Sequence, residues 1–178
     1  MAIFALGDLH LSHSGEKSMA VFGPEWEDHP GKIKANWNRL VSGDDLVIVP
    51  GDISWAMHLW EAKEDLNWLA ALTGQKLLVR GNHDYWWGAI GNVRKALPPG
   101  IYALQNDCFR WGRWTICGTR GWLCPEDELF DPEYDEKIYR RELQRLQLSL
   151  ESGSLQGATD IICALHYPPV NKMVKSSG

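Results

Sequence analysis

The stretch LLVRGNHDYWW, from Leu77 to Trp87, decides how the rest of the chain is interpreted. It begins within the apolar run Lys76–Arg80, which is typical of a strand buried on both faces. An amide, an imidazole and a carboxylate follow directly, at Asn82, His83 and Asp84. Three polar side chains of this kind at the end of a buried strand predict a binding site for a metal ion or a phosphate.

Three other apolar runs end in the same way. Ala2–Leu6 is followed by Asp8 and His10, Asp45–Pro50 by Asp52, and Asp160–Leu165 by His166. Because the carboxyl ends of parallel strands share one edge of a sheet, where ligands bind, we expect these side chains to converge. Gly7, Gly51 and Gly81 precede the polar groups after the strands that end at Leu6, Pro50 and Arg80. Glycine allows sharp turns and a close approach of the backbone to a ligand.

Amphipathic helical patterns alternate with the apolar runs, which predicts an α/β fold. Apolar residues at spacings of three and four predict helices over 30–41, 58–72, 87–97 and 132–151. Further strands are expected over 101–104, 108–111 and 114–118, with a hairpin that adds an antiparallel element. We predict a single domain over residues 1–178, in which the long connection 13–31 is a candidate active-site loop.

Composition indicates an ordinary globular protein. The 178 residues are 44% hydrophobic and carry a net charge of −5 without a Lys/Arg block, so no stable nucleic-acid partner is expected. The four cysteines form no C-x-x-C pair, which favours reduced thiols. No signal-peptide pattern and no apolar run of about 18–20 residues is present, which predicts a cytoplasmic protein without a membrane partner.

The candidate ligands offer oxygen and nitrogen but no thiolate, a set that favours Mn, Fe or Zn. Asp8 and His10 are two residues apart, so in an extended chain both would point at one ion. The whole set suits two ions about 3.5–4 Å apart that share a carboxylate and a water, with Asp52 as the predicted bridge. A single Gly-Asp or His is more often part of a turn or a core. The recurrence at four strand ends favours the metal site.

The blocks GDLH, PGDIS, GNHDYWW and LHYPP resemble the successive motifs of the calcineurin-like metallophosphoesterases. The resemblance implies a four-layer αββα fold in which mixed β-sheets are sandwiched between helices. It also implies a dinuclear metal centre. Asp8 and His10 would hold one ion, Asn82 and His166 the other, and Asp52 would bridge the two.

The resemblance also implies that His83 assists the leaving group and that Asp84 orients it. Elementary chemistry agrees, because a hydroxide that bridges two ions forms near neutral pH and can attack phosphorus. The His83 side chain diverges from that of Asn82 and is available to donate a proton to the departing alkoxide. Asn82 and Arg120 are candidate substrate-binding residues. For Arg120, a surface ion pair is an equally good interpretation.

The last motif of the family, G-H-x-H, has no counterpart before Gly178. By the resemblance, each ion keeps three of four protein ligands, so metal affinity should fall and the sheet should lack C-terminal strands. An exposed sheet edge of this kind predicts self-association. Among the other histidines, His13 is the least implausible substitute ligand. Either the chain is a shortened form, as the segment VKSSG (Val174–Gly178) suggests, or it is a natural short form.

Two classes of function follow. The first is a hydrolase that cleaves a small-molecule phosphomonoester or phosphodiester, which the complete set of candidate residues favours. The second is a non-catalytic binding module with a degraded metal site, which the missing motif favours. Trp55, Trp86 and Trp87 each follow a polar cluster and are candidates to wall the pocket.

Overall fold

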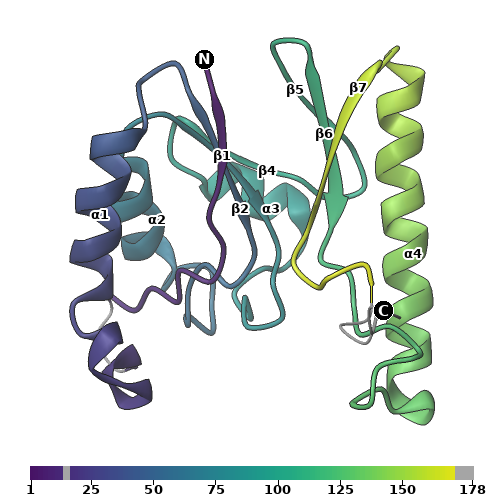
Figure 1. The fold of residues 1–178 in the computed structure, drawn as a ribbon, viewed down its shortest axis with the longest axis horizontal. Helices are drawn as coiled ribbons and strands as arrows, with labels where there is room; N and C mark the ends of the chain where they lie inside the picture. Colours follow the sequence, from purple (N-terminus) through teal and green to yellow (C-terminus); the bar gives the residue numbers. More distant parts are fainter. Residues whose placement is uncertain (14–16, 171–178) are drawn as a thin grey trace, which may run out of the picture. The chain divides into compact units, whose positions relative to one another are not determined.

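The computed structural model describes residues 1–13 and 17–170, which form two compact units. The first unit spans Met1–Ala103 and the second begins at Leu104 (Figure 1). Both units combine strands with helices, so the predicted α/β class is confirmed. The single domain and the four-layer stacking stay predictions, and the segment Val174–Gly178 lies outside the described residues.

The first unit is built on an all-parallel sheet with the strand order β1-β2-β3-β4. Its strands are β1 (Ile3–Ala5), β2 (Leu46–Pro50), β3 (Gln75–Val79) and β4 (Ile101–Ala103). The two central strands are buried along almost their whole length, as continuous apolar runs predict. Because all four strands run the same way, the loops that follow them emerge at one edge (Figure 1).

One face of this sheet packs against the helices of the same unit. They are α1 (His29–Leu40), α2 (Lys63–Ala70) and α3 (Ile90–Ala96), with the 3-10 helices η1 (Met19–Phe22) and η2 (Pro24–Trp26) before α1. Val49 and Leu78 of the sheet share a buried cluster with Trp37, Leu66 and Val93, one from each α-helix. Each such side chain contributes about 1.5–3 kcal/mol on burial. This cluster fixes the sheet edge from which the site is built.

Helix α2 starts at Lys63, later than the predicted start at His58. The reason is Glu61, whose carboxylate accepts hydrogen bonds from the backbone N–H of Met57 (2.8 Å) and His58 (3.1 Å). These bonds close a separate turn before the helix.

No helix in the described part of the chain is long and apolar enough to cross a bilayer.

A buried lysine closes the other end of α2. The ammonium of Lys76 donates to the carbonyl oxygens of Leu72, Gly74 (2.8 Å) and Ala70 (3.5 Å). Of these three residues only Ala70 lies in α2, whose last carbonyls have no partner inside the helix, and Leu72 and Gly74 belong to the turn between α2 and β3. Burial lowers the pKa of Lys76 to about 8.

The second unit is a three-stranded mixed sheet that packs against one long helix. Strand β5 (Phe109–Trp111) pairs antiparallel with β6 (Trp114–Thr119), which pairs parallel with β7 (Asp160–Leu165). Helix α4 (Pro132–Leu155) runs four residues beyond its predicted end. Gly153 lies inside this helix, where a Cβ would come 3.0 Å from the sulfur of Cys117. Glycine at this position allows the helix to approach the sheet closely.

Candidate metal centre

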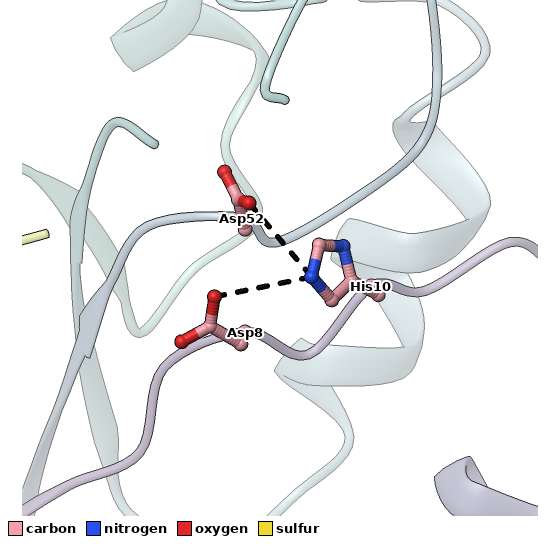
Figure 2. Close-up of side chains that lie close together, drawn as sticks. All are labelled: Asp8, His10 and Asp52. Atoms are coloured by element: carbon pink, nitrogen blue, oxygen red, sulfur yellow. Dashed lines mark ion pairs between the residues drawn. The ribbon is translucent and has the colours of Figure 1, made fainter. Parts of the chain in front are cut away.

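The side chains of Asp8, His10 and Asp52 meet at the carboxyl edge of the first sheet (Figure 2). Nε2 of His10 lies 3.8 Å from Oδ1 of Asp8 and 3.8 Å from Oδ2 of Asp52. One donor atom from each residue lies within 4.8 Å of the other two. Three of the ligands predicted from the sequence are therefore brought together by the loops after β1 and β2.

All three residues have a left-handed backbone. Their φ angles are 55° for Asp8, 45° for His10 and 52° for Asp52. The expectation that Asp8 and His10 lie in an extended chain is therefore wrong, because the backbone turns at each of them. Such conformations cost about 1–3 kcal/mol for a non-glycine residue, and they gather at functional sites.

Backbone hydrogen bonds between the two loops hold this strained geometry. The N–H of Asp8 donates to the carbonyl of Gly51 (3.1 Å), and the N–H of His10 donates to that of Asp52 (2.9 Å). They continue the pairing of β1 with β2 beyond the ends of the strands. The distance between the two aspartates is thus set by the main chain as well as by their side chains.

Gly81 allows the loop after β3 to reach the same carboxylate. A Cβ at this position would lie 2.1 Å from Oδ1 and 2.2 Å from the backbone nitrogen of Asp52, so any side chain is excluded. Oδ1 of Asp52 accepts a hydrogen bond from the N–H of His83 (2.9 Å), and its Oδ2 lies 4.0 Å from Nε2 of His83. Asp52 therefore contacts groups from all three loops.

The ring of His83 lies against the ring of Trp55, with 4.7 Å between the two ring centroids. The ring centroids of His83 and His10 are 5.9 Å apart. The Tyr85 hydroxyl lies 3.4 Å from Nδ1 of His83. The His83 side chain is 36% exposed, so it can meet a substrate from solvent. Asn82, half-buried, precedes it in the same loop.

Asp84 is fully buried and organises the loops through its carboxylate. Oδ1 accepts hydrogen bonds from the N–H of Ile53 (2.8 Å) and Ser54 (3.2 Å), and Oδ2 accepts one from Gly81 (2.7 Å). No contact in the described residues joins this carboxylate to the His83 ring, so any orientation of His83 passes through the backbone. Burial raises the pKa of Asp84 above its usual range.

His166 and Arg120 lie together in the second unit, after β7 and β6. The N–H groups of His166 (3.1 Å) and Tyr167 (2.9 Å) both donate to the carbonyl of Arg120. The Arg120 guanidinium lies 3.2 Å from Oε1 of the buried Glu142 and over the ring of Trp122. The structure contains an ion pair at Arg120, but a buried one and not the surface pair of the second interpretation. A contact with a substrate phosphate stays a prediction.

The geometry of Asp8, His10 and Asp52 fits a divalent ion. Two atoms that each lie about 2.0–2.2 Å from one ion are separated by up to about 4.4 Å. The 3.8 Å separations between His10 and each aspartate fall inside this range and are too long for hydrogen bonds. Two carboxylates and one imidazole are donors that Mn, Fe and Zn accept.

The family model for calcineurin-like phosphoesterases matches residues 1–177. The chain belongs to this family. The resemblance predicted from the four sequence blocks is thereby confirmed.

The chain is similar to two further proteins. The Gene 66 protein of Mycobacterium phage L5 is 31% identical over 77 residues, which are 43% of this chain and 37% of that protein. The match thus covers little more than a third of the phage protein. A solved structure of a protein of unknown function from Aquifex aeolicus has 20% identity and a TM-score of 0.49, over 95% of this chain and 82% of that one.

The three tryptophans predicted to wall a pocket separate into two groups in the structure. Trp55 does lie at the site, since its ring stacks on that of His10 at 4.9 Å. Trp86 and Trp87 are only 2% exposed and belong to the hydrophobic core, so the prediction is wrong for them. Trp86 Nε1 donates to Asp84 (3.0 Å), which explains how its polar atom is satisfied in the core.

His13, the least implausible substitute ligand among the other histidines, is bonded to a buried carboxylate. Both its backbone N–H (2.9 Å) and its Nδ1 (2.7 Å) contact Oδ1 of Asp65 in α2. The other oxygen of Asp65 accepts from the hydroxyl of Ser54. Asp65 thus joins the loop after β1 to the loop after β2. No sequence pattern indicates this role, because acidic residues usually face solvent.

Proposed function

We propose that this calcineurin-like phosphoesterase hydrolyses a phosphoester with a dinuclear metal centre. The observation that supports the proposal is the contact of Asp52 with the loops of His10 and His83. In this proposal Asp8 and His10 bind one ion, and Asn82 and His166 bind the other. Asp52 binds both.

Divalent ions at this edge, of Mn, Fe or Zn, would supply positive charge against the phosphate oxygens. The protein's own residues would position the metal-binding carboxylate and donate a proton to the leaving oxygen. Asp52 is held by the N–H of His83, which fixes the direction of its carboxylate. His83 is close to the cluster and partly exposed, so its ring is placed to donate a proton to the leaving oxygen. Asn82 is also a candidate for a contact with the phosphate.

The proposed substrate is a small-molecule phosphoester, and both monoesters and diesters are included. A stable nucleic-acid partner and a membrane partner are not expected, and the cytoplasmic location also stays a prediction. In the described residues β7 is the last strand of its sheet. Self-association through this strand is proposed, because an edge strand can pair with another chain.

The experiment that tests the proposal is hydrolysis of 4-nitrophenyl phosphate and bis(4-nitrophenyl) phosphate with Mn²⁺. We expect turnover that a chelator removes and Mn²⁺ restores. Asp52→Asn should lower it by about a thousandfold, since charge stabilisation by the ions amounts to several kcal/mol. Asp44→Asn, an exposed residue just before β2, is the matched control. Metal-independent turnover, or an Asp52→Asn protein as active as the parent, would contradict the proposal. Metal binding without turnover would support the binding module instead.

The role of His83 is tested by comparing leaving groups. His83→Ala should slow esters with poor leaving groups by about 10²–10⁴-fold, because these need a proton, and should slow 4-nitrophenyl esters much less. The measurement is kcat against leaving-group pKa for both proteins. Equal losses along the series would argue against proton donation by His83.

A further inference from the structure

A pocket of about 250 Å³ lies beside the metal centre, within the first unit. It is lined by polar side chains from Ser12, His13, Lys17, Ser18, Asp28 and His29 and by apolar ones from Met19, Trp26 and Pro30. A single ordered water needs about 10–15 Å³ of such space, so this pocket admits an organic group. None of the residues assigned to the metals above lines it.

Trp55 connects this pocket to the centre. On the side of the centre, its ring lies 4.9 Å from that of His10 and 4.7 Å from that of His83. On the side of the pocket, its Nε1 donates to the sulfur of Met19 (3.4 Å), and the ammonium of Lys17 lies 5.1 Å from its ring centroid. A molecule with its phosphate at His10 and His83 would therefore reach the pocket by extending past one indole.

Hydrogen bonds anchor the walls of the pocket to the same loops. His29 donates from Nε2 to the carbonyl of Leu9 (3.0 Å), which lies between Asp8 and His10. His13 is bonded to the buried Asp65. The pocket and the metal ligands are thus positioned by shared contacts.

We propose that this pocket binds the organic leaving group of the phosphoester, with Trp26 against its apolar body and the Lys17 ammonium on an anionic substituent. The substrate class is then a phosphoester of a ring-bearing alcohol or phenol that carries a second negative charge. This inference rests on the proposed hydrolase function for its biological meaning, and its test does not require turnover.

The test uses 4-hydroxybenzenesulfonate as the probe and phenol as its uncharged counterpart, titrated into the full chain and followed by NMR. We expect the sulfonate to bind, with a Kd about fivefold higher for Lys17→Met, the ratio that corresponds to a partly exposed ion pair of up to about 1 kcal/mol. Phenol should bind both proteins equally. Lys95→Met, an exposed lysine of α3 that does not line the pocket, should leave both values unchanged.

Trp26→Ala provides a second variant, which should weaken the sulfonate and phenol by the same factor. No binding of the sulfonate, or equal binding by the parent and Lys17→Met, would overturn the inference even if aryl phosphates are hydrolysed. Lys17-dependent binding in a protein without turnover would uphold the pocket and refute the hydrolase. If turnover is present, Lys17→Met should raise KM for 4-sulfophenyl phosphate and leave that for phenyl phosphate unchanged.

Discussion

Two buried carboxylates, Glu142 in the second unit and Asp52 in the first, are surrounded in different ways. Glu142 accepts hydrogen bonds from the Thr119 hydroxyl (2.6 Å) and from the guanidinium groups of Arg145 (2.9 Å) and Arg120 (3.2 Å). The histidine nitrogens beside Asp52 lie 3.8 and 4.0 Å away, and one of its oxygens takes a backbone N–H. Arginines in contact suit a structural ion pair, whereas the 3.8 Å separation between His10 and Asp52 suits a metal ion that both residues bind.

The largest effect on folding is expected at Glu142. Glu142→Gln leaves two guanidinium groups without their carboxylate, which should lower the free energy of unfolding by about 3 kcal/mol. Asp52→Asn in a chelating buffer should leave stability unchanged or raise it, because it removes one of two neighbouring carboxylates. Urea denaturation of both variants measures the difference.

The matched control for Glu142→Gln is Glu136→Gln on the same helix. Glu136 pairs with Arg140 at the exposed surface, where such a pair contributes about 0.3–0.5 kcal/mol. Equal losses for the two variants, or a larger loss for Asp52→Asn than for Glu142→Gln, would break the comparison.

Asp84 sharpens the comparison, because backbone N–H groups surround it instead of arginines. Asp84→Asn places an amide NH₂ group where a backbone N–H donor needs an acceptor. This should lower the free energy of unfolding by about 1–3 kcal/mol. Ile53 and Gly81 donate to different oxygens of Asp84, and asparagine keeps only one of them as an acceptor. Hydrogen exchange should then become faster at the N–H group of Gly81 or at that of Ile53, whichever faces the new NH₂ group. Unchanged exchange at both amides would show that this carboxylate does not hold the loops.

Lys76 is the corresponding case of a buried cation, and its effect depends on pH. Below pH 8 its ammonium is charged in both the folded and the unfolded chain. Between about pH 8 and 10.5 only the unfolded chain keeps the proton, so the lowered pKa makes the free energy of unfolding rise with pH, by at most about 1.4 kcal/mol per unit. Lys76→Met should lack this rise. If the free energy of unfolding changes with pH in the same way for both proteins over this range, a contribution from Lys76 is excluded.

Much of the fold could be predicted because it depends on local patterns. Buried parallel strands show as continuous apolar runs, and all seven strands of the described residues lie within one or two residues of their predicted positions. The start of α2 was missed, because the bonds of Glu61 to preceding N–H groups override the helical spacing.

Three residues of the candidate site could be predicted to lie together, but their geometry could not. The sequence shows that Asp8, His10 and Asp52 follow parallel strands, and the structure brings them together. Their left-handed backbone and the contact of Asp65 with His13 depend on residues more than forty positions apart in the chain, which no local pattern reports. Trp86 and Trp87 were misjudged for the same reason, since their place in the core is set by packing between distant elements.

The most direct test of the account is equilibrium dialysis of the full chain against Mn²⁺, with bound metal and protein counted in the same sample. We expect bound metal that is lost in Asp52→Asn and retained in the Glu136→Gln control. Equal metal binding by the parent and Asp52→Asn would contradict the claim that this carboxylate is the centre of a metal site.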